Sequence, residues 1–381
     1  MRSYIYAPGP TPVPPHVTLK MSEPILNHRS PEYVRLFEEV TEHLKYVFQT
    51  AHDVLTFTAS GTGAMEAAVA NLLSPGDRAV VIRAGKFGGR WAELCAAYGV
   101  EAVPIDVEWG HAVDPSVVAD VLSRESGIKA VFATHSETST GVLHDIETLG
   151  RVVSGRDVLF VVDAISGLGA NDLRPDDWHV DVVVSGSQKG LMLPPGLAFA
   201  SVGPRAWAAS DRATSPRYYL SFKRAKEALK KGLNPYTPAI TLIMGLAEAL
   251  RQIKAEGLAN VFARHARLAE ATRAGVRAIG LELFATRPSN VLTSVTLPAG
   301  IDGNQLLKHL KARYGIIMGG GLDHLKGKIV RIAHLGYADE FHAVVGISAL
   351  EMGLAYLGYQ FKVGVGVAAV QRVLTFERSN V

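Results

Sequence analysis

Seven short apolar segments alternate with stretches of helical character between residues 54 and 202. They are rich in β-branched residues and cover 54–58, 79–83, 102–107, 129–133, 158–162, 181–184 and 197–202. Strands that alternate with helices are typical of a mostly parallel α/β sheet. Unbroken apolar runs such as 130–133 are typical of strands buried on both faces. The sequence therefore predicts a mostly parallel, seven-stranded sheet flanked by helices.

The regions on either side of this pattern have a different character. Five prolines between residues 8 and 15 disfavour a helix or a central strand, and we expect an extended surface arm over 1–20. A length of 381 residues fits two domains at about 150 residues each. We expect a large α/β domain over 21–260 and a small C-terminal α+β domain over 261–381. Helical spacing occurs at 31–50 and 239–279, and the small domain should contain strands 291–297, 314–318 and 328–333 with helices 303–313 and 339–357.

Composition and charge exclude several classes of protein. The 39 basic and 36 acidic residues leave a net charge of +3, which provides no basic surface for nucleic acid or an acidic membrane. A single cysteine, Cys95, excludes a disulfide framework and a cysteine-based metal cluster, and it fits a reducing cytosol. No segment resembles a targeting signal or a run of about 18 apolar residues. We expect a cytoplasmic protein with no metal site and no nucleic-acid or membrane partner.

Two charged residues follow neighbouring strands of the predicted sheet. Asp163 ends the run 158–162, and Lys189 follows the next strand within Ser185-Gly186-Ser187-Gln188-Lys189. Ligands of open α/β sheets bind outside the carboxyl ends of strands. Taken separately, Asp163 fits a turn cap and Lys189 a solvated loop. Together they match the Schiff-base lysine and the acid partner of the ring nitrogen that pyridoxal phosphate enzymes require.

Two glycine-rich segments also follow predicted strands. Ser60-Gly61-Thr62-Gly63 opens a helix, and such a start can bind a phosphate, although it also fits an ordinary capped turn. As a dinucleotide fingerprint it fails, because Glu66 occupies the third glycine position. Phe87, beside Gly88 and Gly89, can lie flat on a planar cofactor or pack in the core.

Two further side chains complete the set of candidates. Thr138 lies in the polar loop after strand 129–133, where its hydroxyl could reach a cofactor or form part of a plain turn. Arg331 lies within the apolar strand 328–333. Its planar guanidinium suits a substrate carboxylate, and a structural ion pair is the alternative.

These segments in this order resemble the class V aminotransferases among the fold-type I pyridoxal phosphate enzymes. More narrowly, the chain resembles their alanine–glyoxylate and serine–glyoxylate (serine–pyruvate) aminotransferase branch. The resemblance runs from residue 8 to residue 336 and rests on Pro8-Gly9-Pro10-Thr11-Pro12, Ser60-Gly61-Thr62-Gly63, Glu137-Thr138-Ser139-Thr140-Gly141, Val162-Asp163-Ala164, Ser185-Gly186-Ser187-Gln188-Lys189 and Val330-Arg331-Ile332.

The resemblance implies a role for each candidate residue. Lys189 would be the Schiff-base lysine and proton carrier, Asp163 the partner of the ring nitrogen, and Arg331 the ligand of the substrate carboxylate. It also implies a homodimer with shared active sites. The remaining cofactor contacts would be Ser60, Gly61, Thr62 and Gln188 at the phosphate, Thr138 at the phenolic oxygen, Phe87 on the ring, and Tyr236 or Thr237 at the partner subunit's phosphate.

The leading function is therefore amino transfer from alanine or serine to glyoxylate or pyruvate. Phosphoserine aminotransferase stays an alternative, because His28-Arg29 resembles its phosphate-binding pair. A lyase that acts on a small amino acid would use the same cofactor residues. A cysteine desulfurase is disfavoured because its catalytic cysteine belongs in the C-terminal half. A non-catalytic subunit and a nicotinamide-dependent dehydrogenase are weaker alternatives.

Overall fold

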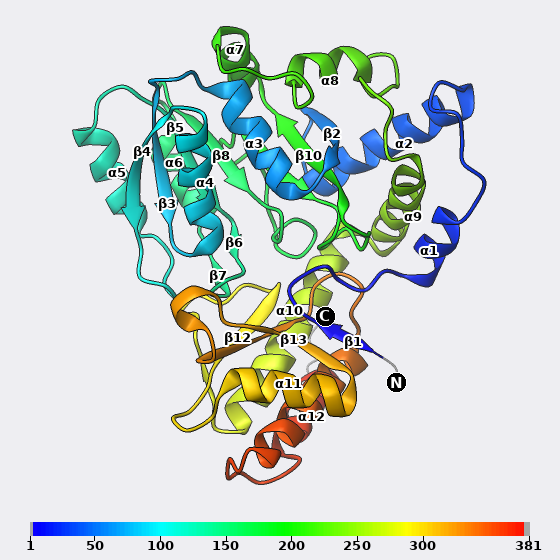
Figure 1. Cartoon of the computed structure of the whole chain (residues 1–381), viewed down its shortest axis with the longest axis vertical. Coiled ribbons are helices and arrows are strands. Elements are labelled where there is room, and N and C mark those ends of the chain that lie inside the picture. The colour runs from blue at the N-terminus through cyan, green and yellow to red at the C-terminus, as the bar shows by residue number, and fades with distance from the viewer. Residues whose placement is uncertain (1–2, 377–381) are drawn as a thin grey trace.

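The computed structural model describes residues 3–376, so the last five residues of the expected small domain lie outside it. All seven expected strands form one sheet in the order β2-β10-β9-β8-β5-β3-β4 (Figure 1). Only β10 runs antiparallel to its neighbours. This confirms the mostly parallel sheet, whose strands are β2 (Asp53–Ala59), β3 (Arg78–Arg83), β4 (Glu101–Asp106), β5 (Ile128–Thr134), β8 (Leu159–Asp163), β9 (Val182–Gly186) and β10 (Gly196–Val202).

Helices cover both faces of this sheet, because its strands are apolar on both sides. In β3, Val80 and Ile82 pack in one core cluster while Ala79 and Val81 pack in the other, as the two-residue period of a strand requires. The first cluster lies beneath α1 (Pro15–Met21), α2 (Pro31–Phe48), α5 (Pro115–Arg124), α6 (Ile146–Val153) and α9 (Ile240–Glu256). The second lies beneath α3 (Gly61–Leu72), α4 (Lys86–Ala97), α7 (Pro204–Arg212) and α8 (Phe222–Leu229).

A second, smaller sheet lies below the first in Figure 1 and has its own apolar cluster. Its strand order is β1-β13-β14-β12-β11, and its pairs are antiparallel except for β1 with β13. The strands are β1 (Tyr4–Tyr6), β11 (Glu282–Leu283), β12 (Leu292–Thr296), β13 (Ile316–Gly320) and β14 (Ile329–Ala333). The helices are α10 (Leu258–Ala278), α11 (Gly303–Tyr314), α12 (Glu340–Tyr356) and α13 (Val365–Phe376), with a short 3₁₀ turn at Asp323–Leu325.

Two expectations about the flanking regions were wrong. The helical stretch 239–279 is two helices, because the chain turns at Gly257 with a φ of 82° that favours glycine. The N-terminal segment is not an extended surface arm. Its strand β1 joins the small sheet, Pro15 begins α1 at a position where proline is tolerated, and Tyr6 and Thr11 are buried. The remaining short strands, β6 (Ser136–Glu137) and β7 (Val142–Leu143), form a hairpin after β5.

Candidate active site

The loops that carry the predicted residues meet at one edge of the large sheet. Thr134 is paired with Asp163, and Asp163 with Val184, so β5, β8 and β9 end side by side. Strand β2 is antiparallel to β10, which is antiparallel to β9, so β2 also ends at this edge. The sheet therefore brings the loops after β2, β3, β5, β8 and β9 together at its carboxyl edge.

Asp163 and Lys189 are the two central charges of this edge. Asp163 is 3% exposed, and among residues 3–376 its carboxylate accepts one hydrogen bond, from the backbone N–H of Ile165 at 2.8 Å. Burial raises the pKa of Asp163 to about 7, with smaller effects from the charges of Glu137, Arg90 and Lys189. Burial, together with the nearby Arg331 charge, lowers the pKa of Lys189 to about 8.

A cradle of backbone N–H groups lies at the start of α3. Ser60 is its N-cap and makes no side-chain capping hydrogen bond. Gly61 and Gln188 lie together here, since a Cβ on Gly186 would be 3.2 Å from the Gly61 nitrogen and 3.0 Å from Gln188 Oε1. Gln188 Oε1 is buried and has no hydrogen-bond partner among the described residues. Free N–H groups at a helix start form a site for an anion, whereas the unpaired Gln188 Oε1 is an acceptor and calls for a donor.

Phe87 lies in the first turn of α4, beside this cradle. Arg90, one turn further along, places its guanidinium carbon 5.0 Å from the centre of the Phe87 ring. Arg90 Nη1 also donates to Thr62 Oγ1 at 3.1 Å. One arginine that the sequence did not single out therefore links the aromatic ring to the helix start.

Arg331 crosses from the small sheet to the large one. It lies on β14 and is 8% exposed. Its Nε donates to the Gly320 carbonyl at 2.8 Å, and its Nη1 donates to the Thr138 carbonyl at 2.6 Å. Burial lowers the pKa of Arg331 to about 10, so the group is charged at neutral pH. The two hydrogen bonds fix the guanidinium plane, and Nη2 makes no hydrogen bond within residues 3–376.

The N-terminal segment reaches the same place, which the sequence analysis missed. Lys189 Nζ donates to the Pro8 carbonyl at 2.6 Å, and a Cβ on Gly9 would lie only 2.5 Å from Nζ. Thr11 Oγ1 donates to the Lys189 carbonyl at 3.0 Å. The proline and glycine of this motif were the only sequence signal, and their contact with Lys189 spans about 180 residues of chain.

Tyr236 and Thr237 lie apart from the groups above. Tyr236 stacks on Tyr219 at 5.1 Å and donates to the Tyr218 carbonyl, and Thr237 is exposed. Asn234 accepts a hydrogen bond from Tyr33 of α2 at 2.5 Å. Residues 234–238 are therefore partly exposed, with Thr237 the most open of them.

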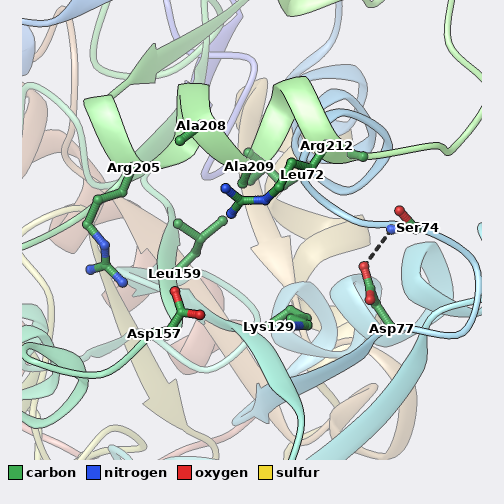
Figure 2. Close-up of a pocket in the computed structure, with 11 residues that line it drawn as sticks. Leu72, Ser74, Asp77, Lys129, Asp157, Leu159, Arg205, Ala208, Ala209 and Arg212 are labelled. Carbon is green, nitrogen blue, oxygen red and sulfur yellow. Dashed lines mark hydrogen bonds between the residues drawn. The ribbon is translucent and has the colours of Figure 1, made fainter.

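A separate hollow of about 410 Å³ lies at the opposite edge of the large sheet (Figure 2). Leu72 and Leu159 line it together with charged side chains such as Lys129, Asp157 and Arg205. Lys129, Asp157 and Arg205 lie near the starts of β5, β8 and α7, away from the carboxyl ends of the strands. None of the predicted site residues lines this hollow.

The family model described as aminotransferase class-V matches residues 3–334, which is most of the chain. The chain belongs to the class V aminotransferases. These are fold-type I enzymes that use pyridoxal 5′-phosphate. The fold is shared with the crystal structure of ureidoglycine–glyoxylate aminotransferase from Bacillus subtilis, at a TM-score of 0.94, 29% identity and 98% coverage of both chains.

Two similar proteins carry names that imply different functions. One is the soluble hydrogenase small subunit of Synechococcus sp. (strain PCC 6716), 45% identical over 380 residues, with 98% of this chain and 99% of the relative covered. The other is serine–glyoxylate aminotransferase of Hyphomicrobium methylovorum, 39% identical over 376 residues, with 96% and 93% covered. The resemblance expected from the motifs is thus confirmed at the level of the family and its glyoxylate branch.

The residues at the carboxyl edge fit the cofactor of a class V aminotransferase. A protonated ring nitrogen would supply the cationic partner that the Asp163 carboxylate lacks. A phosphate would accept hydrogen bonds from the N–H groups at the start of α3 and from the Gln188 amide nitrogen. The Lys189 amine, with its lowered pKa, is suited to attack a carbonyl.

Asp163→Asn should stabilise the cofactor-free protein above pH 7 and weaken cofactor binding. Burial raises the pKa of the Asp163 carboxyl from 3.8 to about 7. Between these pH values the folded state binds more protons than the unfolded state, so the protein loses stability as the pH rises. At about 1.4 kcal/mol per pKa unit, removing this charge should add roughly 2–4 kcal/mol at pH 8. Urea unfolding and cofactor titration measure the two effects.

Asp181→Asn is the matched control. Asp181 is also buried, accepts a hydrogen bond from the Phe160 N–H, and lies at the opposite edge of the sheet. Its substitution should leave cofactor affinity unchanged. If Asp163→Asn binds the cofactor as tightly as the wild type, Asp163 does not pair with the ring nitrogen.

Proposed function

We propose that this class V aminotransferase moves an amino group from a small amino acid, alanine or serine, to a small 2-oxo acid, glyoxylate or pyruvate. One observation carries the proposal: Arg331 of the small sheet reaches the Thr138 carbonyl at the edge where Asp163 and Lys189 meet. A guanidinium at that position would hold a substrate carboxylate beside the reactive amine. The glyoxylate named for two similar proteins supports the choice of acceptor.

Lys189 would hold and move the proton of the reaction. Pyridoxal phosphate, when bound, supplies an electron sink for the pair left when the amino acid's Cα–H bond breaks. With a pKa of about 8, Lys189 Nζ can accept that proton as a neutral amine and return it as an ammonium near neutral pH. Its hydrogen bond to the Pro8 carbonyl would hold the amine when it is not covalently engaged.

The other residues would orient the reactants. Arg331, fixed by the Gly320 and Thr138 carbonyls, would bind the α-carboxylate and set the Cα–H bond toward Lys189. Phe87 would cover the cofactor ring, and Thr138 would meet its phenolic oxygen. Ser60, Gly61, Thr62 and Gln188 would hold the phosphate, while Asp163 would keep the ring nitrogen protonated.

The alternatives differ in what they require of the chain. A cysteine desulfurase needs a reactive thiol, but Cys95 is buried in α4 and burial raises its pKa to about 12. A subunit without chemistry, as one relative's name allows, has no need to retain Lys189, Asp163 and Arg331 together. Phosphoserine transamination and a lyase reaction would use the same cofactor site. They are distinguished from the proposed reaction by the amino donor that is consumed and the product that is formed.

Lys189→Ala should abolish amino transfer and the yellow absorption near about 410–430 nm that a lysine-linked cofactor gives. The methyl group cannot form the covalent link or carry the proton. Lys129→Ala, at the opposite edge of the sheet, is the control and should keep both properties. Absorbance measures the covalent link between lysine and cofactor. Adding single amino acids one at a time and following the loss of this absorption identifies the donor. Turnover by purified Lys189→Ala would disprove the role of Lys189.

Arg331→Lys should raise the half-saturating concentration of the amino acid about 10- to 100-fold, since a charge-assisted hydrogen bond contributes ~1.5–3 kcal/mol. An ammonium cannot make the two parallel bonds of a guanidinium. Arg273→Lys is the control, because Arg273 is equally exposed, at 8%, and donates to the Ser289 carbonyl in the small domain. Cofactor affinity should change in neither variant. Equal donor affinity in Arg331→Lys and wild type would remove Arg331 from the substrate site.

We also propose a cytoplasmic homodimer in which Thr237, or its neighbour Tyr236, contacts the cofactor phosphate of the partner subunit. The exposure of Thr237 and the tyrosine stack at Tyr236 support a contact beyond this chain. A two-fold interface is self-complementary, so each subunit would complete the other's site. No described helix has the length and apolar character needed to cross a membrane.

Mixing Lys189→Ala with Thr237→Ala subunits tests the shared site. In a mixed dimer both lesions fall in one site and the other site is intact, so random exchange should restore activity to about a quarter of the sites. The measurement is turnover after subunit exchange is verified by mass labels. Absence of recovery after exchange, or a fully active monomer in sedimentation, would contradict the shared site.

A further inference from the structure

Glu137 is a buried carboxylate that accepts several hydrogen bonds, and none of the roles proposed above accounts for it. Its side chain, at the end of β6, has no solvent exposure. Oε2 accepts from the backbone N–H of Phe87 at 3.0 Å and of Gly88 at 2.9 Å. Oε1 accepts from the N–H of Ser139 at 3.0 Å and from its hydroxyl at 2.6 Å. Four donors on one carboxylate hold it in a single orientation.

Glu137 and Ser139 together replace the missing cap of α4. The N-cap of this helix is Gly85, which has no side chain, while Ser139 Oγ accepts from the Lys86 N–H at 3.0 Å. The first three N–H groups of α4 are thus bound by a different loop. A Cβ on Gly85 would lie 2.4 Å from Glu137 Cδ and from Ser139 Oγ, so the close approach requires glycine. A carboxylate is favourable at the positive end of a helix.

The same carboxylate is linked to three groups of the active site. Phe87 lies in the first turn of the helix that Glu137 caps, and Thr138 follows Glu137 in the chain. Arg331 donates to the Thr138 carbonyl at 2.6 Å, and the Glu137 charge favours the charged form of that guanidinium. A shift of Glu137 would therefore move the ring-facing phenylalanine, the hydroxyl loop and the carboxylate-binding arginine together.

We infer that Glu137 is a positioning residue that sets Phe87, Thr138 and Arg331 in register around the bound cofactor. This inference rests on the proposed roles of those three residues. Glutamine has the shape of glutamate, but one of its two terminal atoms is a donor. In Glu137→Gln at least one backbone N–H of Phe87, Gly88 or Ser139 therefore loses its acceptor.

Glu137→Gln should weaken pyridoxal phosphate binding about 10- to 100-fold, the loss of one charge-assisted hydrogen bond. It should also reduce the visible circular dichroism of the bound cofactor and raise the half-saturating amino acid concentration more than it lowers kcat. These readouts report the cofactor's surroundings, and a loss of stability alone does not change them. The measurements are cofactor titration, visible circular dichroism and steady-state kinetics.

Glu351→Gln is the matched control. Glu351 is 4% exposed and accepts from the Gly364 and Gly366 N–H groups at 2.9 and 2.6 Å, at the start of α13. Its substitution makes the same chemical change at another helix start and should lower stability while leaving cofactor binding and dichroism unchanged. If Glu137→Gln matches the wild type in affinity and dichroism, or changes no more than Glu351→Gln, the positioning role is wrong.

A milder variant covers the case in which Glu137→Gln does not fold. Ser139→Ala removes the hydroxyl donor to Glu137 and the acceptor of the Lys86 N–H, and it should shift affinity and dichroism in the same direction by a smaller amount. Wild-type cofactor binding and dichroism in Ser139→Ala would then overturn the inference. Failure of the wild-type protein itself to bind pyridoxal phosphate would instead refute the proposed function.

Discussion

The parallel register of β5, β8 and β9 determines where the charged groups of the active site can lie. Because Thr134, Asp163 and Val184 are aligned, the loops that follow begin at the same height and must face one another. The middles of these strands carry apolar side chains that are buried on both faces, so the charged side chains collect toward the strand ends.

The charges gathered there are complementary to the expected ligand. Within residues 3–376 the buried Asp163 carboxylate accepts one hydrogen bond, and the ring nitrogen of a bound cofactor would bring a positive charge to it. The N–H groups in the first turn of α3 have no side-chain cap, and the phosphate oxygens would accept their hydrogen bonds. Arg331 has an edge that the protein does not use, and a substrate carboxylate would fill it. Each charge or hydrogen-bonding group that lacks a partner in the folded chain corresponds to a group that the ligand would supply. Such a match is typical of functional sites.

The sequence predicts those parts of this arrangement that depend on local pattern. Short apolar, β-branched runs predicted all seven strands, and polar residues at or just after the strand ends singled out Lys189, Asp163 and Thr138. Pattern could not show that Pro8 contacts Lys189 or that Glu137 caps α4, because both contacts join distant segments. Gly257 also escaped notice, since a single glycine within a helical pattern is often tolerated and here ends a helix.

The N-terminal segment shows why a domain assignment from sequence order is incomplete in this fold. Strand β1 belongs in space to the small sheet, where Tyr4 is paired with Ile316 of β13, although the chain between them forms the large domain. A Cβ on Gly319 would lie 2.9 Å from Pro8 and 3.3 Å from Arg331, so the bare backbone of β13 lets both approach it. Pro8 in turn holds Lys189. The small sheet is thus connected to Lys189 through the first residues of the chain and to the Thr138 loop through Arg331. A movement of the small sheet would therefore shift both the proposed Schiff-base lysine and the proposed ligand of the substrate carboxylate.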